Sequence, residues 1–164
     1  MAERAWIRGA QRGSVSDLEA LFREHWPRAF RAAYLVVHDA AAAEDIAQES
    51  FLAAVRSLDR FDFRRPFGPW LHRIAVNRAI DWTRARNLRG ETEQLDVPAP
   101  DPPEPDDRML PALASLDPEH RAVIVLRYLL EYTPGEIAEL LELPRGTVNS
   151  RLRRGLDKLK ERLE

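Results

Sequence analysis

Cysteine is absent from the 164 residues of this chain. Its absence excludes disulfides, thiolate nucleophiles and cysteine-based zinc sites. The sequence also lacks a glycine-rich phosphate loop before a helix, an HExxH motif and the Glu-x-x-His pairs typical of di-iron proteins. The histidines share no ligand-like spacing, so we expect packing or surface roles for His25, His38, His72 and His120. The sequence therefore predicts no catalytic centre, no metal site and no cofactor.

Long apolar runs are missing as well. No segment approaches the roughly eighteen consecutive apolar residues that a membrane span needs. The N-terminal stretch MAERAWIRGAQRGS has no apolar core of the kind found in signal peptides. We therefore expect a cytoplasmic protein with no direct insertion into a membrane.

Charge is unevenly distributed, although the formal net charge is only -2. Residues 60–90 carry eight arginines against two aspartates, and residues 145–164 carry seven basic side chains against three acidic ones. Between these blocks, residues 91–107 contain seven acidic side chains and no basic one. Two basic blocks separated by an acidic segment are typical of a protein with two polyanion-binding surfaces.

The spacing of apolar residues predicts an all-α chain. They recur at intervals of three and four residues, whereas β-branched runs with a period of two are missing. Helices are expected over 3–11, 17–37, 39–57, 69–87, 108–116, 118–131, 134–142 and 145–163. Five prolines within 98–105, among acidic residues, leave too few apolar residues there for a core. The sequence predicts two small helical domains, residues 1–88 and 108–164, joined by an acidic, proline-rich flexible linker over 89–107.

The second predicted domain contains a helix-turn-helix pattern. Thr133-Pro134-Gly135-Glu136 is a capping box that opens a short helix, and Pro144 ends that helix just before the next one. The last helix has an apolar side, formed by Val148, Leu152, Leu156, Leu159 and Leu163. Its other side is polar and basic, which is the geometry of a recognition helix in the DNA major groove. Phosphates and guanine edges would then be contacted by Arg151, Arg153, Arg154 and Lys158.

The predicted helix at 39–57 has two different faces. One is apolar and is expected to be buried, with Ala43, Ala47, Phe51, Ala54 and Leu58. The other comprises Asp45, Gln48, Glu49, Leu52 and Arg56. An exposed polar stripe is often merely solvated, but the apolar Leu52 within this one suggests a protein partner.

The stretch RFDFRRPFGPW, residues 60–70, combines aromatic rings with arginines. We expect Phe67 and Trp70 to anchor it on the core. That would leave Phe61 or Phe63, with Arg60, Arg64 and Arg65, to receive an unstacked base and its phosphates. In the helix that follows, Asn77 suits a base edge, and Arg84 and Arg86 suit phosphates.

These motifs, in this order along the chain, resemble the bacterial extracytoplasmic-function (ECF) sigma factors of the sigma-70 family (group 4), which are initiation subunits of RNA polymerase. AAAAEDIAQESFLAAVRSLDRF resembles the core-binding helix of that family's region 2, and FRRPFGPWLHRIAVNRAIDWTRARN resembles its promoter-melting segment. LASLDPEHRAVIVLRYLLEYTPGEIAELLELPRGTVNSRLRRGLDKLKERL resembles its region 4.

The resemblance implies an alternative sigma factor that is not an enzyme, and it implies three sets of contacts. The β′ clamp helices of core RNA polymerase would be bound by Asp45, Gln48, Glu49, Leu52 and Arg56, with the β subunit as a further partner. The minus-ten element of promoter DNA would be bound and opened by Arg60, Phe61, Phe63, Arg64, Arg65, Arg73, Asn77, Asp81, Arg84 and Arg86. The minus-thirty-five element would be bound by Thr133, Arg145, Thr147, Asn149, Ser150, Arg151, Arg153, Arg154 and Lys158. An anti-sigma factor is a further partner that the resemblance implies.

Two other classes of protein share parts of this pattern. A sigma-like decoy would bind an anti-sigma factor without starting transcription, but it would need neither the basic, aromatic segment at 60–90 nor the recognition helix. An ordinary helix-turn-helix transcriptional regulator would not need the stripe that contains Leu52. Because all three features are present, the sigma factor is the interpretation that uses the whole sequence.

Overall fold

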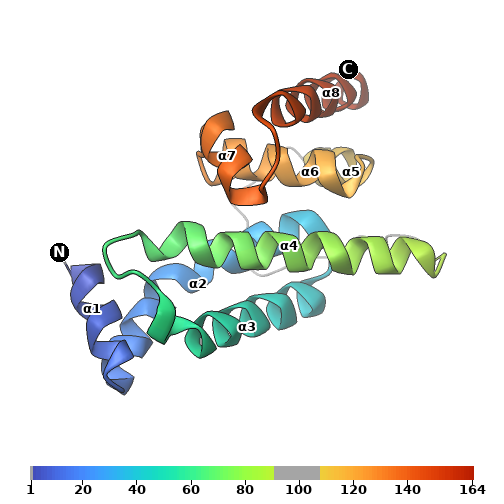
Figure 1. Ribbon diagram of the computed structural model, residues 1–164. Coiled ribbons are helices and arrows are strands. Elements are labelled where there is room, and N and C mark those ends of the chain that lie inside the picture. The colour runs from blue at the N-terminus through green and yellow to red at the C-terminus, as the bar shows by residue number, and fades with distance from the viewer. Residues whose placement is uncertain (1, 91–107) are drawn as a thin grey trace.

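The structure, a computed structural model, describes residues 2–90 and 108–164, and all regular elements in these two ranges are helical (Figure 1). The first range contains α1 (Ala2–Gln11), α2 (Val15–Val37), α3 (Ala40–Arg56), the short 3-10 turn η1 (Leu58–Arg60) and α4 (Phe67–Leu88). The second range contains α5 (Met109–Ala114), α6 (Pro118–Ile124), the π-helical segment η2 (Val125–Leu129), α7 (Pro134–Leu141) and α8 (Arg145–Leu163). The all-α prediction is confirmed. The linker was assigned to 89–107, and its acidic part, 91–107, lies outside the described residues.

Side-chain caps fix where several helices begin. Asp39 accepts a hydrogen bond from the Ala42 amide and caps α3. The cap of α2 is Ser14, so this helix begins two residues earlier than the sequence predicted. Helix α4 also begins early, at Phe67, with Pro69 in its first turn. A proline is tolerated there because the first amides of a helix have no intrahelical acceptor.

The first domain is a bundle of α2, α3 and α4, with α1 packed across the N-terminal end of α2 (Figure 1). The face of α3 that was expected to be inside is buried, with exposed fractions of at most 7% for Ala43, Ala47, Phe51 and Ala54, and Leu58, which lies in η1, is buried as well. Phe51 and Leu58 belong to an apolar cluster that also contains Ile7 of α1 and Phe67 of α4. This cluster holds α1 and the start of α4 against the same core.

The second domain packs directly on α2 and α4 (Figure 1). One continuous apolar cluster joins Val36 and Ile80 of the first domain to Ile124 and Leu126 of the second. The sequence predicted two small helical domains joined by a flexible linker. In the structure the two halves share a core, and we call the contact between them the interdomain interface.

Polar contacts reinforce the interdomain interface. His72 Nδ1 and the Tyr132 hydroxyl lie 2.8 Å apart, and Arg28 donates to the Leu130 carbonyl at 3.2 Å. Arg121 is 1% exposed and donates to the carbonyl of Val36 at the end of α2. Burial of the Arg121 guanidinium is compatible with stability because it finds acceptors, among them one across the interface.

No helix in the two described ranges is both long and apolar enough to cross a membrane.

Candidate nucleic-acid and polymerase interfaces

Helix α3 presents its polar stripe to solvent. All five predicted members are exposed, namely Asp45, Gln48, Glu49, Leu52 and Arg56. Leu52 is 46% exposed, whereas Phe51, its neighbour in the chain, is 7% exposed and faces the core. A large apolar side chain surrounded by polar ones on an otherwise solvated helix is suited to a protein contact.

The aromatic residues of the loop between η1 and α4 stack on one another. Phe67 is 1% exposed and Trp70 packs beside it, so the expected anchoring role of both rings is confirmed. Phe61 stacks on Trp70 with ring centroids 4.4 Å apart and meets Phe67 edge to face at 6.0 Å. The Arg8 guanidinium lies over the Phe63 ring, with its Cζ atom 5.1 Å from the centroid of that ring. The two candidate base-stacking rings are therefore half-buried parts of the loop rather than free side chains.

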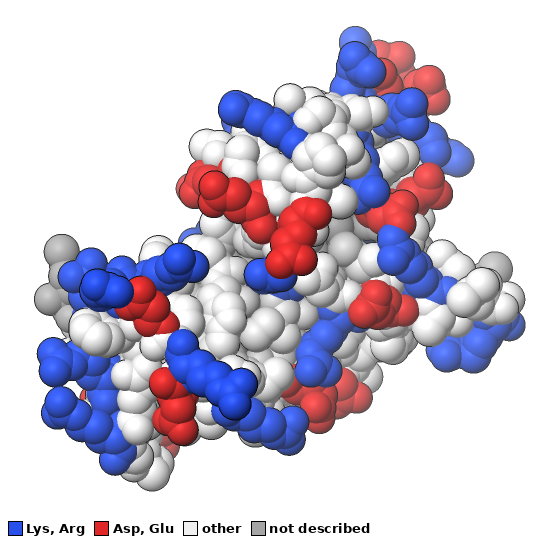
Figure 2. Space-filling model, in the orientation of Figure 1, with Lys and Arg blue, Asp and Glu red and all other residues white. Residues whose placement is uncertain are grey.

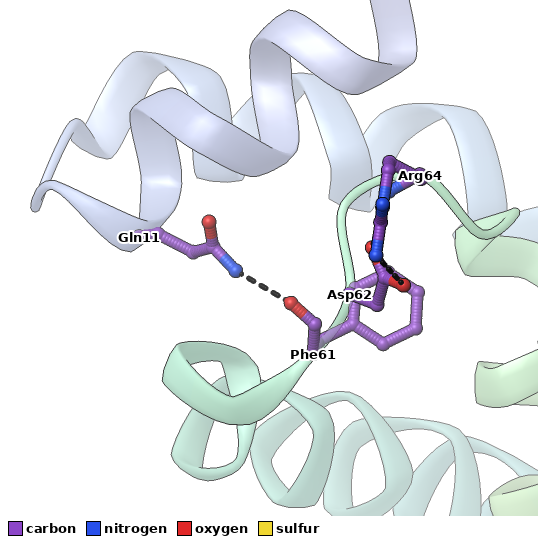
Figure 3. Close-up of polar contacts among 4 residues, drawn as sticks. All are labelled: Gln11, Phe61, Asp62 and Arg64. Atoms are coloured by element: carbon purple, nitrogen blue, oxygen red, sulfur yellow. Dashed lines mark hydrogen bonds and ion pairs between the residues drawn. The ribbon is translucent and has the colours of Figure 1, made fainter.

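The arginines of this loop remain largely in solvent. Arg60 and Arg65 are exposed. Arg64 donates from Nε and its guanidinium to the Asp62 carboxylate at 3.0 and 3.2 Å (Figure 3). The side-chain hydrogen bond from Arg64 lowers the pKa of Asp62, and the bond from the Arg64 backbone amide lowers it further. A phosphate that bound Arg64 would thus compete with a carboxylate already in place.

The polar stripe of α4 is divided between solvent and the second domain. Asn77 and Asp81 are exposed. Arg73 forms an ion pair with Glu142, and Arg84 forms one with Glu119.

Arg86, the last member of the predicted set, is placed differently. Its side chain is only 11% exposed and its guanidinium lies over the Trp82 ring, 5.2 Å from the centroid. Three arginines of α4 that were assigned to the minus-ten element, Arg73, Arg84 and Arg86, are thus engaged within the protein in this arrangement.

A hollow of about 910 Å³ lies between the loop and α7. One wall is formed by the loop and the start of α4, including Arg60, Arg65 and Trp70. The opposite wall belongs to the second domain and carries Glu136 and Glu139. Figure 2 shows acidic side chains gathered where the second domain meets α4. The surface expected to hold promoter DNA therefore faces carboxylates.

The helix-turn-helix forms as predicted. Thr133 and Glu136 make both hydrogen bonds of the capping box, at 3.2 and 3.0 Å. The hydrogen bond from the Thr133 backbone amide to the Glu136 carboxylate lowers the pKa of Glu136, and the Thr133 hydroxyl lowers it further. Helix α7 ends at Leu141, and the left-handed backbone of the next residue, Glu142 (φ 56°), turns the chain towards α8.

Helix α8 carries its basic residues away from the core. Val148, Leu152 and Leu159 are buried as expected, but Leu156 is 39% exposed, so the expected apolar side is not fully covered. The exposed members of the predicted set are Thr133, Arg145, Asn149, Arg153, Arg154 and Lys158, and the half-buried ones are Thr147, Ser150 and Arg151. Within the ranges that the structure describes, no cluster of three potential metal ligands occurs.

Comparisons with known proteins identify both halves. The family model of sigma-70 region 2 matches residues 21–89, and that of sigma-70 region 4 matches residues 112–161. The ECF RNA polymerase sigma factor SigL of Mycobacterium tuberculosis is 37% identical over 90% of this chain and 89% of its own length. The chain belongs to the ECF family of RNA polymerase sigma factors.

Two further relatives extend the match. SigW of Bacillus subtilis, also an ECF RNA polymerase sigma factor, is 29% identical over 96% of this chain and 92% of its own length. The structure of CnrH in complex with the cytosolic domain of CnrY is similar over 99% of this chain and 97% of that one, with 30% identity and a TM-score of 0.76. The first domain is thus region 2 and the second is region 4 of a sigma factor, a non-catalytic subunit of RNA polymerase.

Sequence reasoning missed several residues that shape these sites. Arg121 of region 4 donates to four backbone carbonyls, including those of Leu113 and Leu116, although nothing in the sequence marks it among the other arginines. Gln11 was missed because its two acceptors, the carbonyls of Leu58 and Phe61, are remote in sequence. Only its position near the end of a short amphipathic helix could have suggested a tertiary contact.

Proposed function

We propose that this sigma factor binds core RNA polymerase through α3 of region 2 and directs transcription from promoters that its two regions recognise. The observation that carries this proposal is the exposed stripe around Leu52 on a helix whose other face is fully packed. The stripe, Asp45, Gln48, Glu49, Leu52 and Arg56, would contact the β′ clamp helices. Region 4 would contact the β subunit.

Run-off transcription with purified core polymerase tests the proposal. Leu52→Asp places a charge at the centre of the stripe and should abolish promoter-specific product without unfolding the protein, because Leu52 is 46% exposed. Val15→Asp is the matched control, since Val15 is 71% exposed at the start of α2, outside the stripe. The proposal fails if wild-type protein yields no promoter-specific product, or if both variants remain fully active.

The minus-ten element would be held by residues 60–86 of region 2. Support comes from the loop, where exposed Arg60 and Arg65 flank an aromatic cluster able to present a ring to an unstacked base. Arg64→Ala combined with Arg65→Ala should leave folding intact and weaken open-complex formation, because both side chains are exposed. Normal permanganate reactivity of promoter thymines with this double variant would contradict the assignment.

The minus-thirty-five element would be read by α8. Its exposed Arg153, Arg154 and Lys158 suit phosphates and guanine edges in the major groove. The division between the two kinds of contact can be measured by salt dependence. Loss of a phosphate contact should weaken binding to all sequences alike, whereas loss of a base contact should relax specificity at one position.

Promoter binding would require the two regions to separate. Support comes from the ion pairs of Arg73 with Glu142 and of Arg84 with Glu119, which occupy arginines assigned to the minus-ten element. The carboxylates across the hollow would also repel a DNA backbone. On this proposal the arrangement described above is the closed, cytoplasmic form of the free protein, and DNA phosphates replace carboxylates when it opens.

An anti-sigma factor is the partner that would stabilise the closed form. CnrH, which resembles this chain over nearly its whole length, is bound to the cytosolic domain of CnrY in its solved structure. Purification of the native protein from uninduced cells should therefore return a stoichiometric partner that blocks core binding. Recovery of the protein alone, with full activity, would contradict a regulator of this kind.

A further inference from the structure

Helix α1 lies outside the matched family model, which begins at residue 21. It is nevertheless firmly packed. Ile7 is fully buried, and a Cβ at Gly9 would lie only 1.7 Å from the Asp17 carboxylate, so α1 and α2 meet at a position where only glycine fits without a shift. The placement of α1 is therefore a built feature of this fold.

The two ends of α1 hold the two ends of the loop between η1 and α4. At one end, the Gln11 amide donates to the carbonyls of both Leu58 and Phe61 at 2.9 Å, and Figure 3 shows the second of these bonds. At the other end, the Glu3 carboxylate accepts the first amide of α4, from Phe67, at 3.4 Å. No side chain of the loop caps α4, so Glu3 provides the negative charge that a helix N-terminus favours.

The same helix also reaches the middle of the loop. Arg8 places its guanidinium 5.1 Å from the centroid of the Phe63 ring. Arg4, Arg8 and Arg12 follow one another at intervals of four residues and are all exposed. In Figure 2 basic side chains gather over α1 and continue over the adjoining loop. The loop and α1 thus form one basic surface interrupted by aromatic rings.

We propose that α1 is part of the surface that holds single-stranded promoter DNA, with Gln11 as a positioning residue for the minus-ten loop and with Arg4, Arg8 and Arg12 as a phosphate-binding row. This inference rests on the proposed function. The row lies beside the loop, so it contacts the backbone of the strand whose base the loop holds. Arg12 directly follows α1, and residues four apart on a helix are about 6 Å apart along its axis, which approaches the spacing of successive phosphates in a stretched single strand.

The phosphate row is tested with a variant that combines Arg4→Gln, Arg8→Gln and Arg12→Gln. Affinity of the holoenzyme for a minus-ten single strand is measured between 50 mM and 1 M salt, using fluorescent DNA. Each lost contact reduces the slope of log K against log salt by about 0.7, so the slope should fall by about 2 and binding should weaken about 100-fold at 0.1 M salt. A variant with Arg31→Gln, Lys160→Gln and Arg162→Gln removes the same charge from exposed positions on α2 and α8, and its slope should match that of the wild type.

The positioning role is tested with Gln11→Met, which keeps the length of the side chain and removes both hydrogen bonds. Affinity for the minus-ten strand should fall about tenfold, while affinity for core polymerase and for minus-thirty-five duplex should stay unchanged. A purely structural defect would instead lower all three affinities together.

The outcomes separate this inference from the function on which it rests. If wild-type protein fails in run-off transcription, the proposed function falls. If wild-type protein is active, but the arginine variant has the slope of its charge-matched control, α1 does not bind DNA and the phosphate row is wrong. If Gln11→Met leaves binding of the minus-ten strand unchanged, Gln11 does not position the loop.

Discussion

Acidification should destabilise this protein through two buried histidines at the interdomain interface. Burial lowers the pKa of His38 to about 4, and the Arg121 guanidinium of region 4 acts in the same direction. Burial likewise lowers the pKa of His72 to about 4, with Arg28 as the next cause. Both rings are therefore neutral in the folded protein at pH 5.5, whereas in the unfolded chain, with a pKa near 6.5, each is largely protonated.

The sign and size of the effect follow from proton binding. Because the unfolded state binds more protons, the free energy of unfolding is unaffected above about pH 7 and falls as the pH drops from 6.5 towards 4. Between pH 7.5 and 5.5 each histidine lowers the free energy of unfolding by about 1.4 kcal/mol, or about 3 kcal/mol together. This is a large part of the stability of a typical domain.

Urea unfolding of the wild type and of His38→Asn and His72→Asn at both pH values measures this effect. Asparagine stays neutral at every pH. It also tolerates the left-handed backbone of residue 38, where φ is 56°. Each variant should recover about half of the pH-dependent loss, whatever its stability at pH 7.5. If a variant that combines both substitutions loses as much stability on acidification as the wild type does, the histidines are not the cause.

Three substitutions, one of them with a matched control, test other contacts. In thermal melts, Gly155→Ala should lower the free energy of unfolding by about 1–3 kcal/mol, because the added Cβ would lie 2.6 Å from Ile124 Cδ1. The control Gly146→Ala has open space around its Cβ and should raise the free energy of unfolding by up to about 1 kcal/mol. Phe67→Ala should cost about 3–5 kcal/mol in urea unfolding because Phe67 is 1% exposed, and a loss below 1 kcal/mol would show that it is no anchor. Glu142→Gln removes the exposed ion pair with Arg73, so the free energy of unfolding should change by less than about 1 kcal/mol. Affinity for a minus-ten strand, measured in a DNA-binding titration, should rise. Unchanged affinity would contradict competition between Glu142 and DNA for Arg73.

Features encoded by local sequence were predictable. The capping residues Asp39 and Thr133 act over three residues, so their roles could be read directly from the chain. The inward face of α3 follows from helical periodicity alone. The start of α4 was placed late because Pro69 suggested a first helical position, whereas a proline is equally acceptable anywhere in the first turn.

Features that depend on contacts between remote segments were not predictable. Arg73 and Arg84 are indistinguishable in sequence from arginines left free for DNA, and their pairing with Glu142 and Glu119 depends on how region 4 docks. The surface of region 4 that faces α4 is apolar at its centre, and periodicity assigned those residues to a core without showing that the core is shared. Sequence therefore predicted candidate sites, but it did not show which of their side chains are engaged within the protein.

The closed form owes its stability to apolar contact more than to charge. The ion pairs of Arg73 and Arg84 involve partly exposed side chains, and such pairs contribute at most about 1 kcal/mol each. Salt weakens these pairs and also weakens the attraction between DNA and the same arginines. The shared core around Leu126, which is fully buried, is insensitive to this screening. Raised salt should consequently leave the two regions together while it lowers DNA affinity, so the proposed opening would need a partner that competes for region 4 or α3, and not a change in ionic conditions alone.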